Sequence, residues 1–432
     1  MRRTTTRRAG RTLLVAALAL AAVGCTSSPS PTPSASPATT RAPERGPVML
    51  AVPDVNAAAW TKLAASWNSA HPTEPVTIRA LSADPTVRHD QLAQDAAAKS
   101  GENTILALDS AWVAEFGAKG WVQQLDPATF PTDTMLPGPA AAGTADRVRY
   151  GYPVTAEASV LYYRKDLLSR VGGKVPTTWT ELTATCDQLR TQPEVTAGCY
   201  GTGLRASDPL TGNVIEAINA AGGSVLGPSG QPTLGTAEAA VGVDRLVSAV
   251  KIGTIVADSL TWDDGEAAEA FANGKLIFLR GPLVDARMLE ATDGSSSVAG
   301  RVGVAALVGP GGAAVPNAGG LQLSLSTYGR NDTTAADVIR WLGTPATQRE
   351  LAANGFAPVQ AGLYQDAALV KQVPTLPVFD AALASARPLP VTTHYAELNQ
   401  AIAAALVPVV AGKEQAVTVL TGLQTKLTDL LK

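Results

Sequence analysis

Two aspartates stand where predicted buried strands give way to helices, a position suited to binding a polar solute. Asp54 follows the apolar run 48–52, and Asp109 follows the run 104–108. A carboxylate accepts hydrogen bonds from solute hydroxyl groups, but at a helix start it also serves as an N-cap for backbone N–H groups. Trp112 is either a core residue of the next helix or a stacking surface at the rim of such a site. The sequence leaves both interpretations open at each position.

The elements that would position these residues alternate between strand and helix. Short apolar runs predict strands, and apolar residues at helical spacing predict helices between them. The predicted order is strand 48–52, helix 60–67, strand 76–81, helix 90–99, strand 104–108 and helix 111–119. This alternation favours a parallel sheet covered on both faces, and ligands of such sheets bind beyond the carboxyl ends of the strands.

The first 24 residues have the composition of an export signal. Five arginines precede an apolar run of 11 residues, 13–23, which is well short of the roughly 20 residues that span a bilayer. The end of the run, Ala22-Val23-Gly24-Cys25, resembles the bacterial lipobox, with Ala where Leu is usual. We therefore expect lipid attachment at Cys25; the alternative is a spare thiol. Arg7-Arg8 leaves twin-arginine export open.

Residues 25–46 are rich in Ser, Thr and Pro. Such a chain buries too little apolar surface to fold and acts as an extended spacer. In the polyproline form it would hold a domain up to roughly 65 Å from the membrane. We expect a protein on the extracytoplasmic face of the cell membrane, held there by its N-terminal lipid.

The charge balance excludes one class of partner. The chain has 34 Lys and Arg against 37 Asp and Glu; loss of the five signal arginines leaves 29 against 37, a net charge of −8. No basic run follows Arg11. Nucleic-acid binding requires clustered basic charge, so we do not expect it.

Two further cysteines, Cys186 and Cys199, are expected to form a disulfide, because an exported protein folds in an oxidising compartment. Closing a loop of about 14 residues would stabilise the fold by roughly 3 kcal/mol. We predict no metal site, because none of the three histidines is close in sequence to either cysteine. No cofactor is expected.

The most specific stretch is 150–168, YGYPVTAEASVLYYRKDLL, followed by a Pro-x-x-Trp helix start at 176–179. With these motifs the chain resembles the extracellular solute-binding proteins of bacterial ABC importers, in the maltose-binding-like family 1. The resemblance runs from Val48 to the C-terminus through segments 220–223, 267–275, 281–282, 319–321 and 344–358. Within the family, segment 106–121, Arg387-Pro388 and Tyr395 resemble the trehalose-binding lipoproteins of mycobacteria.

The resemblance implies an α/β fold of two lobes, with a ligand cleft between lobes joined by crossing hinge strands. Residues 47–155 and 322–370 would form lobe 1, and 156–321 and 371–432 lobe 2. The crossings would fall near 153–159 and 317–322, so Glu157, Gly319 and Gly320 would line the hinge side of the cleft. The alternative for the two glycines is an ordinary turn.

Sugar recognition needs acceptors and forked donors for neighbouring hydroxyls, and apolar faces for the ring. Asp54, Asp109 and Glu157 supply acceptors. Arg280 and Arg387 are candidate forked donors, and each is alternatively a solvated or ion-paired surface residue. Trp262 is a candidate stacking surface or a core residue. Glu216 is a further polar candidate or a residue on a helix surface. Leu283 replaces a tryptophan of maltose-type relatives, and aromatic residues make up only 5% of the chain. A compact disaccharide is favoured over a long maltodextrin.

We therefore expect a non-enzymatic binding protein that captures a sugar such as trehalose or maltose and delivers it to ABC importer permease subunits. We expect this protein to be a monomer. One alternative is a carbohydrate-active lipoprotein enzyme. Others are an adhesion or sensor protein of the same fold, and a receptor for a non-sugar or anionic solute. The sequence has no nucleophile elbow, zinc motif or phosphate loop.

Overall fold

The computed structural model of the protein describes residues 44–54, 57–310 and 312–432, and the side chains of all these residues except 312 and 313. The predicted signal peptide, Cys25 and most of the predicted tether lie outside the described residues. Within the described part of the chain, no helix has both the length and the apolar character needed to cross a membrane.

The first of two main sheets has the strand order β2-β1-β3-β14-β6. Strands β1, β2 and β3 are mutually parallel, as the sequence predicts, whereas β14 runs antiparallel to β3 and to β6. The strands are β1 (Val48–Pro53), β2 (Val76–Leu81), β3 (Ile105–Asp109), β6 (Tyr152–Pro153) and β14 (Leu321–Leu325).

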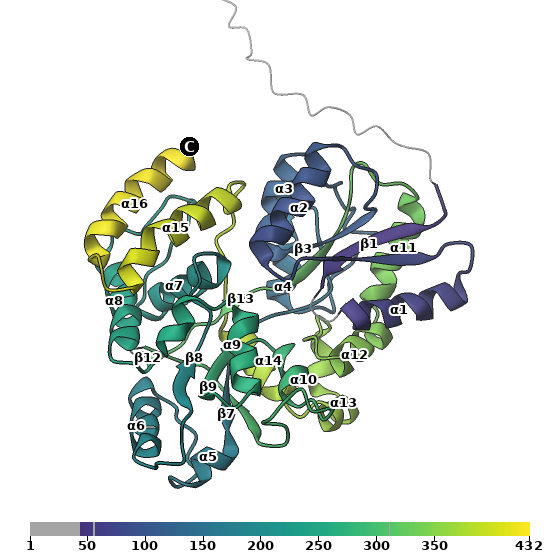
Figure 1. Ribbon diagram of the computed structural model, residues 1–432. Coiled ribbons are helices and arrows are strands. Elements are labelled where there is room, and N and C mark those ends of the chain that lie inside the picture. The colour runs from purple at the N-terminus through teal and green to yellow at the C-terminus, as the bar shows by residue number, and fades with distance from the viewer. Residues whose placement is uncertain (1–43, 55–56, 311) are drawn as a thin grey trace, which may run out of the picture. The chain divides into compact units, whose positions relative to one another are not determined.

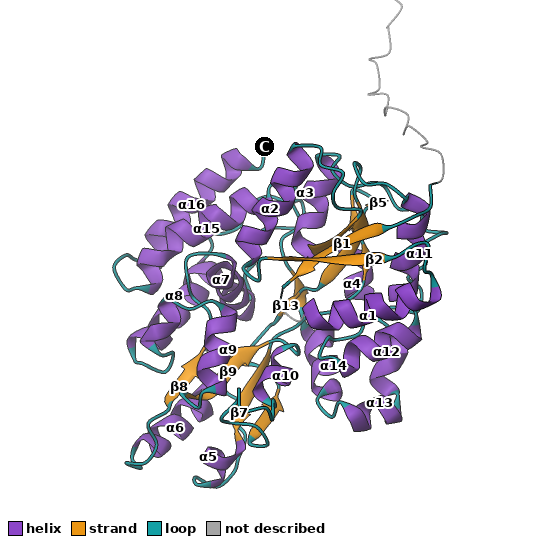
Figure 2. Ribbon diagram, turned by 45° about the vertical axis from the view of Figure 1, so that its right-hand side comes forward, coloured by secondary structure: helices purple, strands orange, loops and turns teal. Residues whose placement is uncertain are grey.

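Helices cover this sheet (Figure 2). Helix α1 contacts β1 and β2, and its predicted apolar residues Trp60, Leu63 and Trp67 are buried in the same core as residues of β1. The helix predicted at 90–99 begins earlier, because Asp84 caps its N-terminus and Pro85 suits its first turn. The helices that follow or precede these strands are α1 (Ala57–Ala70), α2 (Pro85–Ala97), α3 (Val113–Ala118), α4 (Pro137–Ala142), α11 (Asp332–Leu342), α12 (Pro345–Ala353), α13 (Ala367–Gln372) and α14 (Leu376–Ser385), with short 3-10 turns η1 (Ser110–Trp112) and η3 (Ala361–Gln365).

The second main sheet has the order β10-β7-β9-β8. Its central strands are almost wholly apolar and buried, as expected for strands covered on both faces. The strands are β7 (Val160–Arg164), β8 (Gly198–Gly201), β9 (Leu276–Gly281) and β10 (Val302–Ala305). The accompanying helices are α5 (Lys165–Ser169), α6 (Trp179–Arg190), α7 (Asp208–Ala220), α8 (Ala237–Lys251), α9 (Asp264–Ala272) and α10 (Asp285–Leu289), with the 3-10 turn η2 (Ala257–Leu260).

The chain ends in two helices, α15 (Tyr395–Val410) and α16 (Ala416–Leu430). They lie beside α7 and α8 (Figure 1) and share an apolar core with the second sheet, which includes Leu398, Leu406 and Leu420. The C-terminus is thus built around the second sheet.

The chain crosses between the sheets along paired segments. One crossing joins β6 to β7, and another joins β10 to β14 by way of β13 (Asn317–Ala318). Glu157 and Gly319 exchange backbone hydrogen bonds of 2.9 and 3.0 Å between these two crossings. A third crossing contains β15 (Arg387–Pro388), which pairs with β13. Two further ribbons are β4 (Thr144–Ala145) with β5 (Val148–Arg149), and β11 (Val308–Gly309) with β12 (Gly312–Ala313).

The predicted disulfide is confirmed. Cys186 on α6 bonds to Cys199 on β8, and the two Cα atoms lie 5.4 Å apart. Both cysteines are fully buried in the core of the second sheet. The bond fastens a covering helix to the edge strand that it covers.

Candidate functional site

A cavity of about 640 Å³ lies between the two lobes. Its walls are formed at the ends of strands of both sheets and by the crossing segments. Asp109 ends β3, as expected for a site beyond the carboxyl ends of parallel strands. Arg280 comes from β9, and Glu157, Gly319 and Gly320 come from the crossings.

Asp109 is held by an arginine that the sequence analysis did not identify. Arg88, on α2, is 4% exposed and donates from Nη2 to Asp109 Oδ2 at 2.8 Å. Its Nη1 donates to the carbonyl oxygens of Ser82 and Ala83. Asp109 therefore makes an ion pair instead of the side-chain N-cap bond that was its alternative. A basic residue in the first turns of a helix gives no sequence signal for this role.

Trp112 is both a core residue and part of the cavity wall. It is 2% exposed, and the Arg88 guanidinium lies 5.2 Å from its ring centroid. A cation over an indole face is an attractive arrangement. The ring thus fixes Arg88 but offers little open face for stacking.

Gly319 and Gly320 bring the crossing backbones together on the hinge side. Gly320 has φ of +124°, and a Cβ atom there would lie 2.1 Å from the carbonyl oxygen of Thr155. Only glycine fits such a close approach. The ordinary-turn alternative does not describe Gly319, which pairs with Glu157.

The Glu157 side chain is open to the cavity but is surrounded by the lobes. This burial, together with the negative charges of Asp109 and Asp264, raises the pKa of its carboxyl group to about 7, against the opposing effect of Arg280. A carboxyl group of this kind holds a proton near neutral pH more readily than a solvated one.

Arg280, in the cavity wall, and Glu216 form a buried ion pair. Arg280 donates from Nε and Nη2 to the two carboxylate oxygens of Glu216 at 2.7 and 2.8 Å, and each residue is 7% exposed. Glu216 also accepts from the backbone N–H of Asn317 at 3.1 Å. Glu216 lies outside the lining, where it positions Arg280 and the crossing segment.

Three other predicted site residues lie outside the cavity lining. Asp54 and Arg387 are exposed, and Arg387 pairs through its backbone with the crossing segment at Pro316. Trp262 is half-buried and packs against the apolar core, as its structural alternative predicted. The positions of the strand ends therefore predicted the region of the cavity, but they did not predict the direction of each side chain.

Seven acids of the described lining were missed, and three of them are Asp208, Asp264 and Asp285. Each of these three is the first residue of a helix, a place that favours negative charge. Burial and, to a lesser extent, the charge of Asp109 raise the pKa of Asp208 to about 7. Burial also raises the pKa of Asp264, and that of Asp285 well above its usual range, with Asp264 and Glu157 adding to the latter. Asp285 follows the end of β9, so the expectation that ligands bind beyond the ends of strands could have identified it.

An ion cluster joins the lobes at the rim of the cavity. Arg205, which follows β8, donates from Nη2 to Asp84 at the start of α2 over 2.7 Å. The same nitrogen lies 3.0 Å from Asp263, and Nη1 lies 3.3 Å from Glu266. Asp263 and Glu266 form the capping box of α9, which the sequence pattern Asp-x-x-Glu could have revealed.

Several buried polar atoms of the cavity wall lack a hydrogen-bond partner within the described part of the chain. Two are donors, Trp60 Nε1 and Arg88 Nε, and two are acceptors, Asp285 Oδ2 and Asn317 Oδ1. These are four of eleven such atoms in the described chain, and the other seven belong to residues outside the lining. Buried polar groups in folded proteins are normally paired, so these atoms depart from the usual pattern without by themselves marking a ligand. Among the described residues, no group of His, Cys, Asp and Glu is arranged to hold a metal ion.

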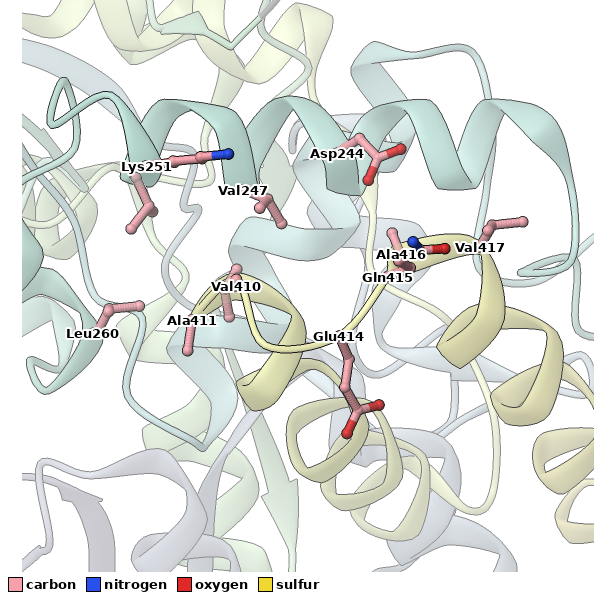
Figure 3. A pocket seen from close by; sticks show the side chains of 12 residues that line it. Asp244, Val247, Lys251, Leu260, Val410, Ala411, Glu414, Gln415, Ala416 and Val417 are labelled. Carbon is pink, nitrogen blue, oxygen red and sulfur yellow. The ribbon is translucent and has the colours of Figure 1, made fainter.

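A second cavity, of about 520 Å³, lies between α8 and the turn that joins α15 to α16 (Figure 3). Its walls are mainly apolar, with Val247, Val410 and Val417 among them. None of the unpaired buried atoms of the described chain belongs to this lining. The cavity between the lobes is therefore the stronger candidate for a polar ligand.

Comparison with known proteins agrees with this geometry. The model of the family described as bacterial extracellular solute-binding protein matches residues 53–349. A probable ABC transporter-binding protein of Deinococcus radiodurans is 31% identical over 277 residues, which cover 60% of this chain and 64% of that protein. A mannitol-binding protein of Pseudomonas aeruginosa is 30% identical over 148 residues, 33% of each chain.

Among solved structures, maltose-bound MalE3 of T. maritima has the same fold. It superposes with a TM-score of 0.83 at 24% identity and covers 89% of this chain and 100% of its own. The predicted fold, α/β with two lobes around a cleft, is confirmed.

Proposed function

Since this chain belongs to the bacterial extracellular solute-binding protein family, we propose that it captures a sugar or polyol in the cavity between its lobes and delivers it to an ABC importer. Proteins of this family bind solutes without transforming them, so the chain is not an enzyme. The Deinococcus relative supports the transport role, the Pseudomonas relative a polyol, and MalE3 a sugar.

The polar side chains of the cavity wall carry this proposal. A solute hydroxyl both donates and accepts, so it can pair with carboxyl groups of the lining such as those of Glu157 and Asp208 and with its arginines. An apolar solute would displace water from these groups without replacing its hydrogen bonds, at a cost in binding free energy for each. The cavity therefore suits a solute with many hydroxyl groups.

The size and the aromatic content of the cavity favour a compact ligand. Its volume is within the range of about 300–1,000 Å³ typical of small-molecule sites. Four aromatic residues line it, and their exposed fractions are only 1% for Trp60, 2% for Trp112, 4% for Tyr395 and 8% for Phe356. We infer recognition through hydrogen bonds, as for a disaccharide such as trehalose or maltose, rather than through a row of stacking rings.

The site residues divide into two groups in this proposal. Asp109, Glu157, Arg280, Trp112, Gly319 and Gly320 line the cavity and would meet the solute. Glu216 acts through Arg280. Asp54, Trp262 and Arg387 would contribute only if a ligand reached beyond the lining.

Delivery would proceed from a protein tethered by a lipid on Cys25 to the outer face of the membrane, with residues 25–46 as the spacer and 47–155 with 322–370 as lobe 1. The protein would dock as a monomer on the permease. Mass spectrometry of the membrane-extracted protein would identify the lipid on Cys25, and a Cys25→Ala variant should lose it.

A thermal-shift screen tests the function. Trehalose, maltose, mannitol, a glycerophosphodiester and betaine are each added in excess; a ligand at 100 times its Kd stabilises the folded state by about 2.7 kcal/mol. We expect a shift with a sugar or polyol, one binding site per chain by calorimetry, and recovery of the solute unchanged. A shift with betaine or the phosphodiester alone would contradict the proposal.

A further inference from the structure

The wall of the cavity between the lobes is strongly acidic. Among the described residues that line it, nine are Asp or Glu and two are Arg, and none is Lys or His. Some of these acids have structural roles at the rim, where Asp84, Asp263 and Glu266 surround Arg205. Of the remaining acids, Glu269 is exposed, and the others, termed the interior acids, are Asp109, Glu157, Asp208, Asp264 and Asp285.

Both arginines of the wall are already neutralised. Arg88 pairs with Asp109 at 2.8 Å, and Arg280 pairs with Glu216 through two short hydrogen bonds. Their other bonds go to backbone carbonyls and, at 3.5 Å, to Asp264. Neither guanidinium has a free fork for a phosphate or carboxylate of a solute, so the cavity is poorly suited to an anion.

Three interior acids have no such partner. Glu157, Asp208 and Asp285 make no ion pair with any described residue, although Tyr395 donates to Asp208 over 3.5 Å. Asp285 Oδ2 is buried without a partner among the described residues, and a Cβ atom at Gly281 would lie 2.3 Å from it. The negative charge of Asp264 raises the pKa of both Glu157 and Asp285, and the charge of Glu157 also raises the pKa of Asp285. The interior thus contains a surplus of acceptors and of negative charge.

An ammonium group has the complementary chemistry. It carries a positive charge and three hydrogen-bond donors but no acceptor, whereas a hydroxyl contributes one donor and two acceptor lone pairs. In the absence of a cation, repulsion among these carboxyl groups is relieved by protons. A bound ammonium would take the place of such a proton and gain charge-assisted hydrogen bonds.

We propose that the solute is a polyhydroxylated amine, an amino sugar or amino polyol, whose ammonium group binds between the two unpaired acids Glu157 and Asp285. This inference rests on the proposed function, because it assigns a charge to the solute of the same cavity. The hydroxyl groups of the solute meet the remaining polar atoms of the wall.

The test compares solutes that differ in charge but little in shape. Dissociation constants are measured by calorimetry for trehalose, trehalosamine and trehalose phosphate, and for sorbitol and glucamine. We expect the amine of the matching pair to bind roughly tenfold or more tightly than its neutral partner, with no detectable binding of the phosphate. Equal or tighter binding of the neutral partner would overturn the inference and leave the proposed function intact. Binding of no sugar or polyol in any charge state would overturn both.

Two variants connect the preference to the carboxylates. Asp285→Asn removes one negative charge with little change of shape, and we expect the ratio of the neutral to the amine Kd to fall severalfold. Asp244→Asn makes the same change at an exposed site on α8 (Figure 3), and the ratio should stay at its wild-type value. An unchanged ratio in Asp285→Asn, with the variant folded, would overturn the placement of the ammonium.

A second measurement needs no variant. At about pH 6 an amino sugar is protonated, and Glu157, with a pKa of about 7, holds its proton in the free protein. Binding the amine should therefore release up to about one proton, detected by calorimetry in buffers of different ionisation enthalpy. Binding the neutral partner should release none. Equal proton release for both would contradict the exchange of a proton for an ammonium.

Discussion

The rim and the interior of the cavity contain many acids, but their surroundings differ. At the rim, Arg205 gathers three carboxylates from both lobes, and all of them are partly exposed. In the interior, Glu157 and Asp285 form no ion pair with a described residue, and the nearby Arg280 is paired with Glu216 through two short hydrogen bonds. The carboxylates at the rim are paired with an arginine of the protein, whereas Glu157 and Asp285 in the interior are available to pair with a ligand.

The largest difference should appear when the same substitution is made in both regions. Arg280→Met leaves Glu216 as a buried carboxylate without its partner, and we expect a loss of about 3–5 kcal/mol in the free energy of unfolding. Arg205→Met removes an arginine that is 35% exposed, and we expect a loss of at most about 1 kcal/mol. Urea unfolding of both variants measures the two losses. Equal losses would remove the distinction between rim and interior.

The second largest effect should be on ligand affinity, through the interior acids. Asp109→Asn keeps the shape of the side chain but weakens the hold on Arg88 and on solute hydroxyls. We expect the Kd of the best neutral ligand to rise more than about tenfold, a change of about 1.4 kcal/mol. Asp54→Asn is the matched control, because Asp54 also follows a strand but is exposed outside the lining. The comparison fails if both variants bind equally well.

The stability of the ligand-free protein should depend on pH through the same acids. The pKa values of Glu157 and Asp208 are about 7 in the folded protein, above the roughly 4 of an unfolded chain. Between these values the folded state binds more protons, so its stability falls as pH rises from about 4 to 7. We expect Tm to decrease over this window and the decrease to be smaller in Glu157→Gln. A Tm profile identical to wild type in that variant would contradict this origin.

The smallest effect should come from the rim. Arg205→Met breaks the bridge to Asp84 and so favours separation of the lobes. Because exposed ion pairs contribute about 0–1 kcal/mol, we expect the Kd to rise at most about fivefold. Raising the salt concentration should weaken wild-type binding of a neutral sugar slightly and leave the variant unaffected. Lys432 and Asp429 form an exposed pair far along the sequence, so Lys432→Met serves as the control.

The sequence contained enough information for the architecture. Alternating strands and helices predicted the parallel arrangement of β1, β2 and β3, and spacing alone placed Trp60, Leu63 and Trp67 in the core. It could not predict the antiparallel β14, which arrives from more than 200 residues later in the chain. Strand order depends on such distant pairing, which local patterns do not encode.

The site was predicted less completely than the fold. Asp109 and Glu157 were found because strand ends and crossing segments must face the cleft. Arg88, Asp208 and Asp264 were missed because they start helices or lie within them, where charged residues are common for local reasons. Asp54 and Arg387 were expected at the site, yet their side chains are exposed outside the lining. The direction of a side chain depends on the packing around that residue, and the spacing of residues in the sequence does not contain this information.

The pairing of Glu157 with Gly319 has a mechanical consequence. The backbone of Glu157 is bonded in both directions to the neighbouring crossing, and its carboxyl group belongs to the cavity wall. Gly320, beside it, leaves no space for a side chain against Thr155. A solute that binds this carboxyl group would therefore hold on to the two paired crossing segments directly, without a further side chain between the ligand and the connection that joins the two main sheets.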